Sequence, residues 1–206
     1  MQKPGTPKTQ GITLESAIIA LILVIGAIAA AVFFIRGTSA PEVDPIIVSE
    51  TVRRDIASAI KRYRDRMGFF PPDVARGWDP GLEQAFPWNP DFGTSAPPTG
   101  VFRDDGTDCA HCPANWREVV AERWNGPYLT WPSSTFWGGK YDYNHWPGGA
   151  IESGCLLKKG IYLAIQGDYQ NEHRVPRTIE ERMIERNIDD DACINTEIQM
   201  LLRDLN

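Results

Sequence analysis

The sequence predicts an α+β protein in which a long N-terminal helix packs on a small antiparallel β-sheet head with long loops. Three observations indicate this fold class. Residues 16–35 are 20 consecutive positions without a charged side chain. Residues 48–67 carry apolar side chains at helical spacing, and segments 141–144 and 160–165 have the aromatic and β-branched composition of strands. The 16 prolines and 18 glycines of the chain predict that the rest of the head is rich in loops.

The uncharged run near the N-terminus is long enough to cross a membrane. A helix of its length spans roughly 30 Å, the thickness of a bilayer's hydrocarbon core. A secretory signal would have a shorter apolar core followed by a small-residue cut site, whereas here the small residue Gly11 precedes the run and the acid Glu15 lies at its start. Lys3 and Lys8 before the run, against Arg36 after it, favour a leader inside the cell and a head outside.

The residues Gly11-Ile12-Thr13-Leu14-Glu15 carry a family resemblance. They resemble the class III leader motif of type IV pilins and type II secretion pseudopilins, which reads G-F-T-L-x-E. The resemblance implies that prepilin peptidase cuts after Gly11 and that Ile12 becomes the new, N-methylated terminus. This chain departs from the family pattern at two points. Glu15 is the fourth mature residue instead of the fifth, and Phe33 stands where the family has a proline.

Glu15 also has a physical reason to take part in assembly. An ionised carboxylate in hydrocarbon is costly unless it is paired. The resemblance implies that its partner is the α-ammonium group of Ile12 on a neighbouring subunit, so that the pair sets the stagger between subunits. The alternative is a hydrated Glu15 at the level of the lipid headgroups. The partners that the resemblance implies are copies of this chain, other pilins or pseudopilins, prepilin peptidase and the inner-membrane assembly platform.

The same resemblance implies a domain order and a location. Residues 1–11 are the leader, 12–36 the transmembrane and filament-core helix, 37–68 the second half of the stem helix and 69–206 the globular head. The phrases IASAIKRYRDRMGFFPPD and WNGPYL resemble the major pseudopilin more than adhesive pilins. The implied protein is a single-pass protein of the inner membrane, with its head in the periplasm or outside the cell. The alternative is an anchored binding or adhesion domain that never polymerises.

The helix and strand expectations can be placed along the chain. Gly68 and the prolines at 71 and 72 end the first amphipathic helix. Thr178, with Glu181 three residues on, predicts a capping box at the start of a later helix. The apolar stripe of the first helix is Val48, Val52, Ile56, Ile60, Tyr63 and Met67. After it we expect a short helical turn at 82–86, a helix at 115–123, strands at 141–144 and 160–165, a helix at 178–186 and an edge strand or helix at 196–202.

Four cysteines lie after the apolar run, which indicates an oxidising compartment. Four cysteines allow three pairings. We favour Cys109 with Cys112 and Cys155 with Cys193. The second bridge would close a loop of nearly 40 residues and stabilise the fold by roughly 4 kcal/mol in the chain-entropy model.

These cysteines have two alternative uses. A redox dithiol needs a lowered thiol pKa, but aspartates crowd the approach to Cys109 and would raise it. Zinc would find three ligands in Cys109, His111 and Cys112, with Cys155 or Cys193 as a fourth, although the usual doubled C-x-x-C spacing is absent. A local disulfide clip therefore explains Cys109 and Cys112 more simply.

A metal candidate lies near the C-terminus. The family's major pseudopilin carries calcium in a C-terminal loop, and Asp189, Asp190 and Asp191 offer the hard oxygen ligands that calcium prefers. The alternating ligands and glycine turn of a calcium loop are absent, so a solvated acidic turn is the alternative. We expect either no cofactor or calcium.

The net charge of −6 is unevenly distributed. Residues 49–68 carry six basic and three acidic side chains, whereas residues 69–206 carry 12 basic and 21 acidic ones. An acidic head does not favour nucleic acid. The basic helix face would instead lie against a neighbour's acidic head, or be solvated. His145 and His173 have no serine or cysteine at catalytic spacing, and the chain has no phosphate loop or nucleophile elbow, so we expect no enzyme.

Overall fold

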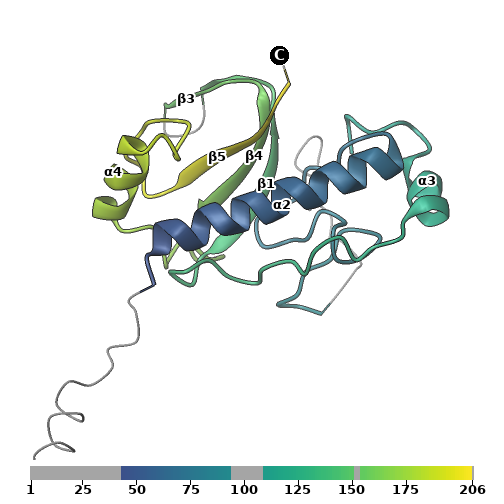
Figure 1. Ribbon diagram of the computed structural model, residues 1–206, viewed down its shortest axis with the longest axis horizontal. Coiled ribbons are helices and arrows are strands. Elements are labelled where there is room, and N and C mark those ends of the chain that lie inside the picture. The colour runs from purple at the N-terminus through teal and green to yellow at the C-terminus, as the bar shows by residue number, and fades with distance from the viewer. Residues whose placement is uncertain (1–42, 94–108, 151–153, 206) are drawn as a thin grey trace, which may run out of the picture. The chain divides into compact units, whose positions relative to one another are not determined.

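The computed structural model describes residues 43–93, 109–150 and 154–205 (Figure 1). The chain divides into two compact units, Met1–Val43 and Asp44–Asn206. The second unit combines helices with antiparallel sheet, so the α+β class is confirmed for it. The helix expected over residues 12–36 lies outside the described residues.

Helix α2 (Pro45–Met67) has well-defined ends. The side chain of Asp44 caps its start by accepting a hydrogen bond from the Ile46 backbone N–H at 3.0 Å. Pro45 occupies the first turn, where its missing N–H is tolerated. Gly68 ends the helix with φ 88°, and its N–H donates to the carbonyl of Arg64 at 2.8 Å, as the sequence predicted for this glycine.

One face of α2 is buried along most of its length. Ile56, Ile60, Tyr63 and Met67 of the expected stripe lie in the core. Near the N-terminal end the buried positions are instead Ile46 and Ser49, and Val48 and Val52 are only half-buried. No helix among the described residues combines the length and apolar character needed to cross a membrane.

The sheet that α2 crosses has the order β1-β4-β5, with all pairs antiparallel (Figure 1). Its strands are β1 (Lys140–Trp146), β4 (Gly160–Gln166) and β5 (Ile198–Asp204). Every residue of the central strand β4 is buried. Leu163 pairs with Tyr143 on one side and Met200 on the other, and all three belong to the core.

The two strands predicted from composition are therefore confirmed, and each is longer than expected. The segment expected at 196–202 as strand or helix is the edge strand β5. A two-stranded hairpin, β2 (Gly149–Ala150) with β3 (Leu156–Leu157), was not predicted. Two-residue strands are too short for periodicity to reveal.

The short helices flank the ends of α2 (Figure 1). Helix α3 (Trp116–Arg123) lies beside its C-terminal end, as expected for 115–123. Helix α4 (Arg177–Glu185) lies near its N-terminal end, where Arg182 Nη2 is 3.5 Å from Asp44 Oδ2.

The capping box predicted for α4 is wrong. Pro176 occupies the N-cap position and offers no side-chain cap, so Thr178 lies inside the helix. Glu181 does not reach back to a backbone N–H but pairs with Arg177 at 2.9 Å. Pro176 is extended through its ψ of 134°, and as N-cap it lies two residues before Thr178, where the sequence had placed the cap.

The helical turn expected at 82–86 is also wrong. These residues form bends. The buried carboxylate of Asp79 accepts hydrogen bonds from the backbone N–H groups of Leu82, Glu83 and Gln84 at 2.7–3.0 Å. A side chain that takes these donors replaces the acceptors a helix would supply.

The basic face of α2 is partly committed to its own head. Three of its six basic side chains donate to backbone carbonyls of other segments. Arg53 donates to Leu201. Arg62 donates to Tyr128 and Arg66 to Arg123. These contacts hold α2 to β5, to the end of α3 and to the segment after it.

Candidate functional site

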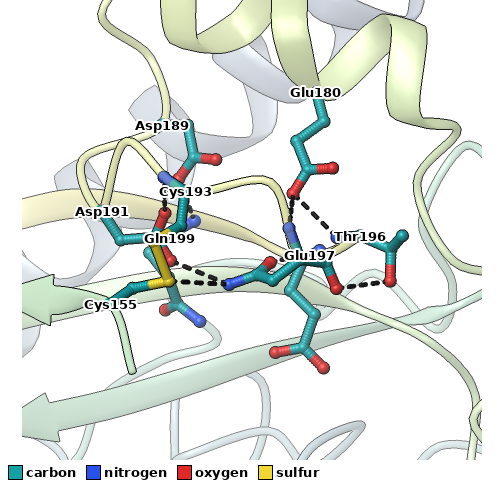
Figure 2. Close-up of a disulfide and its surroundings, with 9 residues drawn as sticks. Cys155, Glu180, Asp189, Asp191, Cys193, Thr196, Glu197 and Gln199 are labelled. Atoms are coloured by element: carbon teal, nitrogen blue, oxygen red, sulfur yellow. Dashed lines mark hydrogen bonds between the residues drawn. A yellow bond between two sulfur atoms is a disulfide. The ribbon is translucent and has the colours of Figure 1, made fainter. Parts of the chain in front are cut away.

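The structure joins Cys109 to Cys112 and Cys155 to Cys193, the pairing that the sequence favoured. The first pair is a local clip between residues three apart. The second pair links the segment before β3 to the loop before β5, across a separation of 38 residues. Around this second bridge lies the group of acidic side chains that makes the candidate site (Figure 2).

The clip lacks the placement of a redox dithiol. Helix α3 begins at Trp116, beyond both cysteines, so no helix starts at Cys109. A helix N-terminus is one of the features that lower a reactive thiol's pKa. The geometry therefore favours the disulfide clip over the thioredoxin-type alternative.

The three consecutive aspartates do not act as one set. Asp189 and Asp191 are buried, and Asp190 is exposed. The carboxylate of Asp190 accepts the Leu201 N–H at 2.6 Å, and its own N–H donates to the Gln199 carbonyl. Asp190 thus holds the loop against β5 and is not placed as a ligand beside its two neighbours.

Asp189 and Asp191 both accept hydrogen bonds from nearby residues of the fold. Asp189 Oδ1 accepts the Gln199 N–H at 2.9 Å. Asp191 accepts the Cys193 N–H at 2.8 Å and the Asn195 side-chain amide at 3.2 Å. Asp189 Oδ2 is buried and has no hydrogen-bond partner among the described residues.

A third acid, Glu180, comes down from α4 toward the same loop (Figure 2). It is fully buried, and its Oε1 accepts the N–H groups of Asn195 and Thr196 at 2.7 and 2.8 Å. Its Oε2 is a second buried oxygen without a partner among the described residues. A buried oxygen of this kind normally requires a donor or a cation.

The pKa values of all three acids are raised. Burial, reinforced by the charges of Asp191 and Glu180 and opposed by the Gln199 N–H, raises the pKa of Asp189 to about 8. Burial also raises the pKa values of Glu180 and Asp191. Backbone N–H groups oppose this rise for both acids, and for Asp191 hydrogen bonds with the side chains of Asn195 and Asp189 oppose it as well. Among the ion pairs of the described residues, none joins a lysine or arginine to these acids. A positive charge would therefore stabilise the loop.

We call Glu180, Asp189 and Asp191 the carboxylate cluster. Carboxylate oxygens are hard ligands that suit calcium, and two of them are unused. The cluster is more open than a finished metal site, because among the described residues its three carboxylates do not lie together within 4.8 Å; Asp191 lies that close only to the bonded sulfurs of Cys155 and Cys193. A calcium ion would have to draw Glu180 and Asp189 together through the loop between α4 and β5.

The sequence analysis did not identify Glu180 as a candidate ligand, although its position in the helix gives an indication. It stands three residues before Met183 and four before Ile184, and so shares the apolar face of its helix. An acidic residue on the buried face of a helix indicates a functional site more strongly than an acidic residue in an exposed run does. The predicted leader and assembly residues Gly11, Ile12 and Glu15 lie outside the described residues.

Comparison with known proteins does not assign this chain to a family. No protein-family model, no curated protein and no solved structure matches the chain.

Proposed function

We propose that this protein is a pilin-like filament subunit of a type II secretion or type IV pilus-like machine. The observation that carries the proposal is the order of residues at the N-terminus, where Gly11, then Thr13, Leu14 and Glu15, open a long uncharged run. Prepilin peptidase would remove the leader, and the single-pass protein would then polymerise from the inner membrane with its head in the periplasm or beyond.

The described unit supports this proposal in its layout. Helix α2 begins shortly after the uncharged run and lies across an antiparallel sheet, as expected for the lower half of a stem helix packed on a head. Val43, just before this helix, and Ile47, in its first turn, expose more than half of their surface. In a filament these apolar side chains would be covered by neighbouring stems, which would contribute to assembly.

The carboxylate cluster supports a calcium site as part of the same function. Calcium bound by Glu180, Asp189 and Asp191 would offset two of the three negative charges of these acids and tighten the loop that leads into β5. The bridge from Cys155 to Cys193 holds this loop to the β2–β3 hairpin. The ion's role would be structural, fixing a surface of the head that neighbouring subunits contact.

The decisive experiment concerns the mature N-terminus. Mass spectrometry of the protein expressed with a prepilin peptidase should find a chain that begins at Ile12, and cells should display filaments. Glu15→Ala should reduce filament yield at least tenfold, because the α-ammonium group of the next subunit loses its partner. Glu15→Asp, which keeps the charge, should retain part of the yield.

Two results would contradict the proposal. One is a chain that keeps Met1 when the peptidase is present. The other is a normal yield of filaments from the Glu15→Ala variant. Either would favour an anchored head that does not polymerise.

A further inference from the structure

The bridge between Cys155 and Cys193 is part of the loop that carries the carboxylate cluster (Figure 2). Asp191 lies two residues before Cys193, and its Oδ1 accepts the Cys193 backbone N–H at 2.8 Å. A carboxylate oxygen of Asp191 also lies within 4.8 Å of both sulfur atoms of the bridge. The position of this acid therefore depends directly on the bridge.

Asn195 connects the bridge to two acids of the cluster. Its side-chain Nδ2 donates to Asp191 Oδ2 at 3.2 Å and to the Cys155 sulfur at 3.8 Å. Its backbone N–H donates to Glu180 Oε1 at 2.7 Å. One residue thus contacts the disulfide, an acid of the loop and the acid that comes from α4.

The bridge attaches this loop to a different part of the head. Cys155 directly precedes β3, which pairs with β2, whereas Cys193 lies in the loop between α4 and β5. The two cysteines are 38 residues apart in the chain. A bridge of this length removes conformational freedom that the loop would otherwise lose when it binds a cation.

The cluster needs such a restraint because its acids repel one another. Glu180 and Asp189 are buried, and each keeps one oxygen that has no hydrogen-bond partner among the described residues. Ionised carboxylates that are buried together favour separation and hydration. A loop that is fixed at Cys193 has less freedom to separate them, so the acids remain available to a cation.

We propose that the Cys155–Cys193 bridge controls the calcium site, so that the carboxylate cluster binds calcium tightly only after the bridge has formed. The inference rests on the calcium site of the proposed function. Bridge formation takes two electrons and two protons from the two thiols, and a partner disulfide accepts them and becomes a dithiol. Asn195 acts as a positioning residue that links the bridge to the acids.

The coupling has a consequence for the order of maturation. Disulfides form after export to an oxidising compartment and are rare in the reducing cytoplasm. The head therefore acquires its calcium after export. Linkage is reciprocal, so bound calcium favours the bridge by the same factor by which the bridge favours calcium.

The first test measures the calcium affinity of the full chain in detergent micelles, under oxidising conditions, by competition with a calcium-chelating dye. Cys155→Ser with Cys193→Ser should weaken calcium binding by roughly tenfold or more, a usual size of coupling between sites. Cys109→Ser with Cys112→Ser, the matched control, removes the other disulfide and should leave the affinity within about twofold of the parent. Circular dichroism restricts the comparison to temperatures at which each variant is folded.

A third variant keeps both bridges. Asn195→Ala removes the side-chain amide but keeps the backbone N–H that bonds Glu180. It should weaken calcium binding by roughly threefold or more, because Asp191 loses its link to the Cys155 sulfur.

The second test uses the parent chain alone. The chain is equilibrated in glutathione buffers of different redox ratio, with calcium or with chelator, and each bridge is scored by peptide mass spectrometry. Oxidised glutathione takes up the two electrons and two protons of each bridge that forms. Calcium should shift the ratio at which the Cys155–Cys193 bridge is half-formed by roughly tenfold or more, and should not shift it for Cys109–Cys112.

The outcomes separate this inference from the site on which it rests. A parent chain that binds no calcium would overturn both the calcium site and the coupling. If the parent binds calcium, equal affinity in the folded Cys155→Ser with Cys193→Ser variant would overturn the coupling alone. A half-formation ratio of that bridge that does not respond to calcium would do the same.

Discussion

At the scale of single residues, neighbouring acids in this chain have opposite roles. Asp190 lies at the surface and bonds the backbone of β5, whereas Asp189, one residue earlier, is buried with an unused oxygen. Their side chains are identical, so the difference comes only from what surrounds them. This contrast supplies a matched pair of variants for the calcium proposal.

We predict that calcium stabilises the head through Asp189 and not through Asp190. Calcium at 100 times its dissociation constant should add about 2.7 kcal/mol to the free energy of unfolding, and a chelator should remove the gain. The Asp189→Asn substitution should abolish the gain, while Asp190→Asn should keep it. Thermal unfolding with calcium, with magnesium and with chelator measures the difference.

The amide in Asp189→Asn still offers an oxygen to the Gln199 N–H, so in chelator this variant should remain within about 1 kcal/mol of the parent. A calcium response equal in the two variants, or absent from the parent chain, would exclude the carboxylate cluster as the site.

At the scale of elements, α2 owes its place to one buried face. Ile56 is fully buried against the sheet, whereas Ile47, on the same helix, exposes 59% of its surface. Both residues are isoleucines within the same helix, so substituting either one changes helix propensity by a similar amount. Comparing the two substitutions therefore isolates the contribution of core packing.

The Ile56→Ala substitution should therefore lower the free energy of unfolding by about 2–5 kcal/mol, because it leaves a cavity in the core. Ile47→Ala should change the same quantity by about 0.5 kcal/mol or less. Denaturant unfolding of the two variants gives the comparison. Similar losses from both would mean that the buried stripe does not hold the helix on the sheet.

At the scale of the whole molecule, the two disulfides constrain the chain to different degrees. The bridge from Cys155 to Cys193 spans 38 residues and joins a hairpin to the loop before the edge strand. The clip spans three residues and restricts only a turn. Loop-closure entropy grows with the length of chain that a bridge encloses.

Removing the long bridge by Cys155→Ser with Cys193→Ser should thus lower the free energy of unfolding by about 4 kcal/mol, and removing the clip by about 2 kcal/mol. Chemical denaturation under oxidising conditions measures both losses. A larger loss from the clip than from the long bridge would show that native-state contacts outweigh chain entropy here.

Sequence patterns anticipated the elements that depend on local periodicity. The stripe on α2, its end at Gly68, and strands β1 and β4 follow from side-chain spacing and backbone preference, which act over a few residues. The same reasoning failed at Thr178, where a proline just upstream set the helix start. It failed again at 82–86, where the buried Asp79 captured the backbone donors.

The sequence by itself determined where the long uncharged run lies, which face of α2 is apolar and which chemistry four cysteines allow. Only the tertiary structure decided that Glu180 joins Asp189 and Asp191, that Asp190 does not, and that His145 lies against the clip. The acids come from α4 and from the loop that follows it, whereas His145 comes from β1, 34 residues after His111 of the clip. Burial, which fixes their charge and their hydrogen bonds, exists only once the separate segments pack on one another.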